Sequence, residues 1–199
     1  WYAWRLEPAP PRPPAEAAPA AAGKPRLVVL VVFQGLRGDA VARWEPLFGP
    51  GGFRRMKADG VWYPDCHVPF AHTTAAPGLA SLVTGVPPSV HGVVGDRWFD
   101  RKSGQTTSAE PGQILAPAVA DQLPAGGRCV SAALDPAAAG LLGGSRPAAA
   151  YAYDAESGHV RPVPADRPSQ PWADQFNASA AARRWFGKPW DRLGNAGAY

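Results

Sequence analysis

The chain has 199 residues, a formal net charge of +4 and 46% hydrophobic residues, enough for one domain with a packed core and too apolar for a disordered protein. Its basic residues are scattered and form no nucleic-acid-binding motif, so we expect no nucleic-acid partner. No apolar run approaches the roughly 20 residues that span a bilayer. The composition favours a globular domain.

Residues 1–23 differ in composition from the rest of the chain. They begin with an aromatic and basic stretch, WYAWR, and continue as a proline- and alanine-rich segment. Such a segment favours an extended, semi-rigid spacer, and interfacial aromatics followed by a basic residue often flank a membrane anchor. We expect residues 1–23 to be a linker after a removed anchor, residues 24–199 to form the domain, and the protein to be exported, periplasmic or membrane-tethered.

The first predicted element is a strand over Leu27–Phe33. Its residues are all apolar and mostly β-branched, without alternation, which is typical of a strand buried on both faces. The strand leads into a turn at Gln34, and ligands of open α/β sheets bind at the carboxyl ends of strands. A hydroxyl-rich loop near residue 73 then enters a helix that ends at Gly85. With Pro77 in the first turn of that helix, its free amides predict an anion site.

The remaining elements alternate between strands and helices. Helices are predicted over residues 39–44, 51–60, 114–123, 135–142 and 172–186. Strands are predicted over residues 61–68, within 86–100, over 128–134, and as a hairpin of 149–153 with 159–163, while residues 101–112 read as a polar loop. This alternation predicts an α/β fold, a layered sandwich with a mainly parallel sheet.

The two cysteines, Cys66 and Cys129, do not have the spacing of metal ligands. We expect two buried thiols. A disulfide in an oxidising compartment is the alternative.

Five motifs occur in one order along the chain. They are LVVLVVFQGLRGD at 27–39, GGFRRM at 51–56, TTAAPG at 73–78, PPSVHGVVG at 87–95 and DRWFD at 96–100. In combination they resemble the alkaline phosphatase superfamily, in its type I phosphodiesterase/nucleotide pyrophosphatase branch with a threonine nucleophile. The resemblance covers roughly residues 24–190. It implies an alkaline-phosphatase-like fold, of which this chain corresponds to the N-terminal part.

The resemblance also implies a phosphoester hydrolase with two zinc ions. In the family, an aspartate after the first strand binds zinc, and a threonine attacks phosphorus with help from the metal. An asparagine and, in one subgroup, a Lys-x-Arg pair hold the phosphoryl oxygens. The remaining zinc ligands come from a second half of the family's domain.

This sequence departs from the family at each of those positions. Gln34 occupies the metal-aspartate position, and its neutral amide is a poor zinc ligand. Ala75 occupies the nucleophile position and has no oxygen. Asp96 occupies the asparagine position, where its carboxylate would repel phosphate. Asp135 and Ala137 occupy the Lys-x-Arg positions.

These departures favour a catalytically degenerate scaffold that acts as a non-catalytic or binding module and needs no cofactor in this chain. The alternative is an active phosphomonoester or phosphodiester hydrolase completed by a missing C-terminal half or a partner chain. A third hypothesis is a truncated relic whose uncovered sheet edge is prone to association.

Other candidate residues have a functional and a structural interpretation. Thr74 would be a displaced nucleophile or a loop or capping hydroxyl, and Asp39 a metal ligand or a helix cap. His72 would be a metal ligand or a loop histidine. His91 is interpreted as structural, and Asp96 with Arg97 as a solvated or ion-paired turn.

Overall fold

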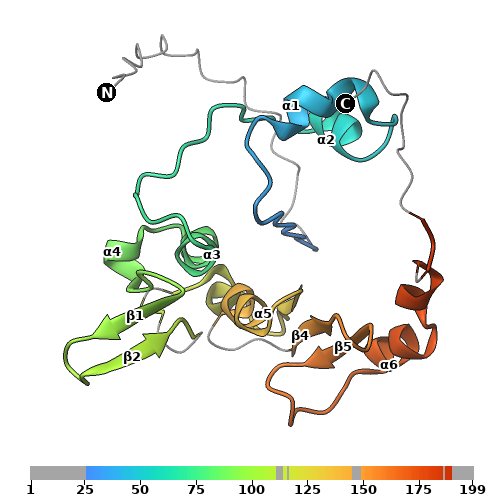
Figure 1. Ribbon diagram of the computed structural model, residues 1–199. Helices are drawn as coiled ribbons and strands as arrows, with labels where there is room; N and C mark the ends of the chain where they lie inside the picture. Colours follow the sequence, from blue (N-terminus) through green and yellow to red (C-terminus); the bar gives the residue numbers. More distant parts are fainter. Residues whose placement is uncertain (1–25, 111–113, 116, 145–148, 186, 190–199) are drawn as a thin grey trace. The chain divides into compact units, whose positions relative to one another are not determined.

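The computed structural model describes residues 26–110, 114–115, 117–144, 149–185 and 187–189 (Figure 1). The predicted linker over residues 1–23 lies outside this part. The chain divides into two compact units, Trp1–Leu36 and Arg37–Tyr199, and each is described by itself. The predicted α/β class is confirmed. None of the described helices is long and apolar enough to cross a membrane.

The first predicted strand does not form. Residues Leu27–Phe33 form no strand, and the exposed fraction is 79% at Leu27 and 58% at Phe33. A strand needs neighbours that complete its hydrogen-bond ladder, and the described residues supply no such ladder here. The turn expected after the segment does form at Gln34 and Gly35, where Gly35 has a φ of 72°.

The second unit begins with three short helices. They are α1 (Ala40–Trp44), the 3₁₀ helix η1 (Glu45–Leu47) and α2 (Phe53–Asp59). As predicted, α2 ends at Gly60. A Cβ at Gly60 would lie 2.6 Å from the carbonyl oxygen of Met56, so only glycine fits this close approach.

The strand predicted over residues 61–68 is absent. Those residues form no regular element, and Val61, Tyr63 and Val68 are exposed. As with the first segment, the apolar pattern is present, but no described strand pairs with it.

The helix predicted after the threonine-rich loop is confirmed as α3 (Ala75–Thr84). Pro77 lies in its first turn, and Gly85 ends it in the left-handed conformation, donating to the carbonyl of Ser81 at 2.8 Å. Its buried residues are Ala76, Pro77, Leu79, Ala80 and Val83. A single helical turn, α4 (Pro88–His91), comes before the strand predicted within residues 86–100, because Pro88 favours the first turn of a helix and Gly92 ends it with a φ of 82°.

A hairpin of two antiparallel strands follows. Strand β1 (Arg97–Asp100) lies in the range predicted to contain a strand, whereas β2 (Gln105–Ser108) lies where a polar loop was predicted. The carboxylate of Asp100 accepts from the amides of Lys102 and Ser103 at 3.0 and 3.2 Å and so holds the turn. Of the helix predicted over 114–123, the described residues form only η3 (Val119–Gln122).

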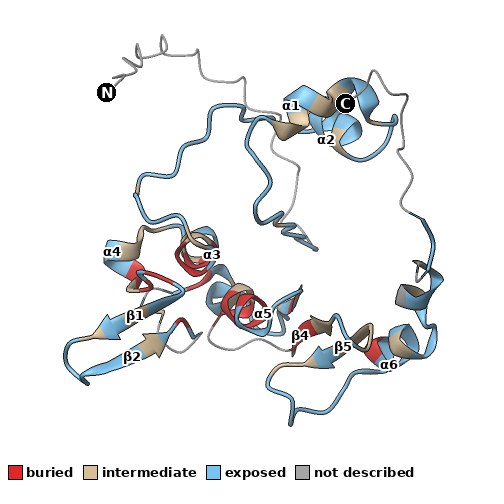
Figure 2. Cartoon of the chain, in the orientation of Figure 1, coloured by how far each residue is buried: buried red, intermediate tan, exposed pale blue. Residues whose placement is uncertain are grey.

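The largest sheet has the order β3–β4–β5. Strand β3 (Val130–Ala133) runs parallel to β4 (Ala149–Asp154) and is connected to it through α5 (Pro136–Gly143). Strand β5 (His159–Pro162) pairs antiparallel with β4 and forms the predicted hairpin. Among the described strands, parallel pairing is thus confined to β3 and β4. The hydroxyl of Ser131 donates to the carbonyl of Ala139 at 2.6 Å and ties α5 to β3. Buried residues gather on α3, α5 and β4 (Figure 2).

The last helix is shorter than predicted: α6 (Pro171–Ala178) is followed by the 3₁₀ helix η4 (Ala181–Trp185). Helix α6 lies beside β5 (Figure 1). The ring of Trp172 packs edge-on against buried Tyr151, with centroids 4.5 Å apart. The Tyr151 hydroxyl accepts from the amide of Gln170 at 2.9 Å. These contacts fix the start of α6 on the sheet.

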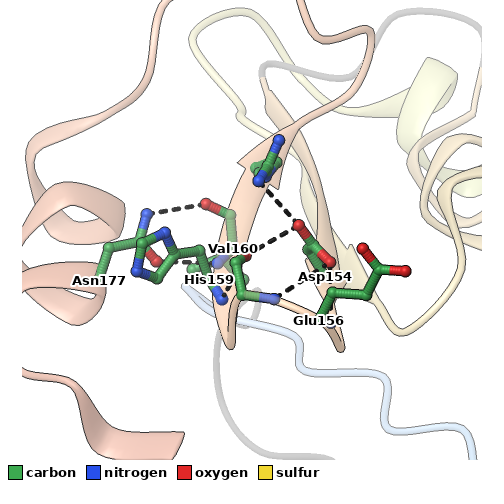
Figure 3. A network of polar contacts seen from close by, with 7 residues as sticks. Asp154, Glu156, His159, Val160 and Asn177 are labelled. Carbon is green, nitrogen blue, oxygen red and sulfur yellow. Dashed lines mark hydrogen bonds and ion pairs between the residues drawn. The ribbon is translucent and has the colours of Figure 1, made fainter.

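Side chains stabilise the β4–β5 hairpin at its turn and along the outer edge of β5 (Figure 3). At the turn, Asp154 accepts from the amide of Glu156 at 3.0 Å and the hydroxyl of Ser157 at 2.8 Å. The hydrogen bond from the Ser157 hydroxyl is the main cause that lowers the pKa of Asp154, and the bond from the Glu156 amide lowers it further. At the outer edge, the side-chain amide of Asn177 accepts from the Val160 amide at 2.8 Å and donates to its carbonyl at 3.0 Å. Asn177 therefore takes the place of a neighbouring strand.

Candidate functional site

The candidate site is the first turn of α3. Thr74 precedes the helix with an extended backbone, as an N-cap residue does, but its side chain makes no capping hydrogen bond. Its hydroxyl oxygen is buried and has no hydrogen-bond partner. The predicted capping role of Thr74 is therefore wrong, because the hydroxyl does not reach the helix amides.

Ala75 is the first residue of α3 and is exposed. It presents a methyl group at the position where the family that the sequence resembles has its threonine nucleophile. The next amide, that of Ala76, donates to the carboxylate of Asp96 at 2.7 Å. Asp96 is exposed, in line with the interpretation of a solvated turn, but its carboxylate is bound to the helix start and not ion-paired with Arg97.

His72 lies beside the same turn. A Cβ at Gly95 would be 3.5 Å from its Nε2 atom, so the imidazole lies against the residue that precedes Asp96. The His72 side chain is exposed. The structure therefore brings His72, Ala75, Ala76 and Asp96 together, next to the buried hydroxyl oxygen of Thr74 in the sequence.

A serine–histidine pair that the sequence analysis did not identify joins α3 to α4. The buried Nε2 atom of His91 is 3.0 Å from the hydroxyl oxygen of Ser81, and Nδ1 accepts from the amide of Val93 at 3.1 Å. Because Nδ1 is the acceptor, Nε2 carries the proton and donates to Ser81. The ring therefore offers Ser81 no lone pair, and the pair cannot work as nucleophile and base. Burial lowers the pKa of His91, which agrees with its predicted structural role.

The two residues at the predicted Lys-x-Arg positions lie at the start of α5. Asp135 is the N-cap of this helix, and its carboxylate accepts from the amide of Ala138 at 2.9 Å. Ala137 is exposed within the first turn. Both residues serve the helix start, and neither presents a cation.

The described residues do not fit a pair of zinc ions. Gln34 lies exposed in its turn with a neutral amide. Asp39 precedes α1 without capping it, because its carboxylate binds Arg37 at 2.8 Å, and this hydrogen bond lowers the pKa of Asp39. Within the described ranges, no three histidine, cysteine, aspartate or glutamate side chains form a group able to hold a metal.

Both cysteines are free thiols, and Cys66 is exposed. The prediction of two buried thiols is wrong for Cys66, because the strand expected around it does not form. Burial is the main cause that raises the pKa of the Cys129 thiol, and the negative charge of nearby Asp121 raises it further.

Comparison with known proteins identifies relatives of this chain. The family model described as type I phosphodiesterase/nucleotide pyrophosphatase matches residues 28–196. The alkaline phosphatase PhoV of Synechococcus elongatus is 27% identical over 204 residues, covering 88% of this chain and 36% of PhoV. The alkaline phosphatase PafA of Elizabethkingia meningoseptica is 27% identical over 194 residues, covering 85% of this chain and 36% of PafA.

The fold is also shared with a solved structure. The crystal structure of wild-type PafA superposes with a TM-score of 0.73 at 24% identity, over 80% of this chain and 35% of the PafA chain. This chain therefore has part of the alkaline phosphatase fold and spans little more than a third of the length of these relatives.

Proposed function

Because the chain belongs to the type I phosphodiesterase/nucleotide pyrophosphatase family, we propose that it retains the scaffold of a phosphoester hydrolase without the activity and serves as a binding or structural module. The lineage is that of phosphoester hydrolases, since the chain matches this family and its relatives PhoV and PafA are alkaline phosphatases. The proposal concerns what this chain does with the inherited scaffold.

The observation that carries the proposal is the absence of an available nucleophile at the start of α3. Ala75 offers only a methyl group there. The neighbouring hydroxyl of Thr74 is buried and bonded to nothing, so no base activates it and no solvent-borne substrate reaches it. A serine or threonine hydroxyl attacks phosphorus only when a base or a metal activates it.

The donor set further supports the proposal. In the family that the sequence resembles, zinc generates the attacking alkoxide. Here Gln34 is uncharged and Asp39 is paired with Arg37, so the described residues do not provide a dinuclear site. We therefore assign no catalytic step to zinc in this chain.

We further propose that the partner is a polypeptide, either the counterpart of the remaining length of the relatives or a separate protein. The exposed apolar residues Leu27–Val31 support this proposal, because contiguous exposed apolar residues usually mark an interaction site. The further proposals that the protein is exported and tethered to a membrane rest on the composition of residues 1–23 alone.

The decisive experiment is hydrolysis of a chromogenic phosphate monoester and diester, with and without added Zn²⁺. It compares the wild type with Thr74→Val and, as a matched control on the exposed neighbouring hydroxyl, Thr73→Val. We expect no turnover above the buffer blank from any of the three proteins, each shown to be folded by a cooperative thermal melt. Neither valine removes a capping bond, so both variants should fold.

Two outcomes would contradict the proposal. Zinc-dependent turnover that disappears in Thr74→Val but persists in Thr73→Val would identify Thr74 as a displaced nucleophile. Turnover that persists in both variants would show that another group performs the reaction.

A further inference from the structure

The first turn of α3 has few free donors. The first amides of a helix have no partner within the helix. In α3, however, Pro77 has no N–H, and the amide of Gly78 already donates to the carbonyl of Thr74 at 3.3 Å. The amides of Ala75 and Ala76 remain, and the second of these donates to the Asp96 carboxylate. A negative group of the protein itself thus occupies the positive end of the helix.

The backbone around Asp96 is held from both sides. The carbonyl of Asp96 accepts from the amide of Ala109 at 3.0 Å, which ties it to the end of the β1–β2 hairpin. Gly95 is buried, and a Cβ there would lie 3.2 Å from the carbonyl oxygen of Arg97. The carboxylate of Asp96, an exposed residue, therefore reaches Ala76 from a backbone that is held in place by these contacts.

A second observation concerns the residue before the helix. The Thr74 hydroxyl oxygen is buried and, in the described part of the chain, makes no hydrogen bond, although buried polar atoms almost always have partners. Thr74 therefore does not cap α3, and the side chain that binds an amide of the first turn is that of Asp96.

We propose that Asp96 is an internal anion that occupies this turn and keeps phosphate and other oxyanions out of it. This inference rests on the proposed function, since it describes how the inherited anion site has been closed. An external phosphate would have to displace a charge-assisted hydrogen bond. It would also bring its own negative charge next to a carboxylate tethered by the β1–β2 hairpin.

The test is a titration with inorganic phosphate, followed by the ¹H–¹⁵N resonance of Ala76 in the wild type and three variants. Asp96→Asn removes the charge at constant shape, and Asp96→Ala also frees the Ala76 amide. Asp100→Asn is the matched control, because it removes one negative charge from the same hairpin and leaves the Asp96 contact in place. We expect no phosphate-dependent shift in the wild type or in Asp100→Asn, and an affinity at least about tenfold higher in both Asp96 variants.

The proposal is wrong if the Ala76 resonance of the wild type moves with phosphate, or if the Asp96 variants bind phosphate no better than the wild type. An equal gain in Asp100→Asn would also contradict it, since net charge alone would then explain the effect. The wild-type titration decides against the proposal even if a variant does not fold. The hydrolysis assay is independent, so turnover by the wild type would overturn the proposed function and leave this binding result to be judged separately.

Discussion

At the scale of single residues, His91 has a structural role that depends on its neutral form. Nδ1 accepts from the amide of Val93, and Nε2 faces Ser81 inside the core between α3 and α4. A proton on Nδ1 would remove the acceptor for Val93 and place a charge in the buried interior. The folded chain therefore disfavours protonation, in line with the lowered pKa of His91.

This lowered pKa predicts a loss of stability in mild acid. The unfolded chain binds the proton near the ordinary histidine pKa of about 6.5, whereas the folded chain binds it only at lower pH. The contribution of His91 is complete above about pH 6.5 and is lost as the pH falls toward the folded-state pKa. We expect the Tm to fall between about pH 7 and 5 in the wild type and much less steeply in His91→Gln.

The control is His67→Gln, which changes an exposed histidine outside the regular elements. This variant should keep the pH dependence of the wild type. At about pH 7, His91→Gln should itself cost roughly 2 kcal/mol of unfolding free energy, because it disturbs buried hydrogen bonds. A wild-type pH profile retained in His91→Gln would disprove the assignment.

At the scale of elements, the outer edge of β5 is closed by one side chain of α6. Exposed strand edges invite pairing with other chains, and here the Asn177 amide bonds both the N–H and the C=O of Val160. The Asn177-Ala178-Ser179 sequence matches the acceptor pattern of N-glycosylation. The Nδ2 atom to which a glycan would be attached donates to the carbonyl of Val160. Asn177 therefore links α6 to the sheet as a structural residue.

Removing this link should loosen α6. Asn177→Ala leaves both backbone groups of Val160 without a protein partner, and we expect it to lower the unfolding free energy by about 1–3 kcal/mol. Gln175→Ala, an exposed change on the same helix, should alter it by less than about 0.5 kcal/mol. Denaturant unfolding of the three proteins measures both values, and equal stabilities would show that the Asn177 contact contributes nothing.

At the scale of the whole molecule, the main feature is an exposed apolar segment. In the segment Leu27–Phe33, every residue except Val32 is exposed. The chain corresponds to 36% of the length of PhoV and PafA. Contiguous exposed apolar residues of this kind usually mark an interface. We expect the isolated chain to associate with itself when no other partner is present.

Sedimentation velocity over a range of concentrations tests this expectation. Leu30→Lys, in the middle of the segment, should shift the chain toward the monomer, whereas Thr106→Lys on exposed β2 should not. The Tm of Leu30→Lys should be unchanged, because Leu30 is 58% exposed and belongs to no described sheet. A wild type that is monomeric at all concentrations would refute the expectation. A cooperative thermal melt of monomeric Leu30→Lys would favour a folded binding module over the hypothesis of a truncated relic.

The sequence by itself determined the family, the α/β class and the elements with strong local signals. Helix α3 follows from its proline in the first turn and Gly85 at its end. The β4–β5 hairpin follows from two apolar runs around a polar turn, and α5 from Asp135 and Pro136 at its start. Such signals lie within a few residues of each other, so they act whatever the rest of the chain does.

Only the tertiary structure decided the contacts between distant residues. The bond from Ala76 to Asp96, the Ser81–His91 pair and the edge closed by Asn177 join positions that no sequence spacing connects. The same reason explains the failed strands over residues 27–33 and 61–68. Apolar, β-branched runs favour an extended backbone, but a strand exists only where a neighbour completes its hydrogen-bond ladder, and that neighbour is a property of the fold.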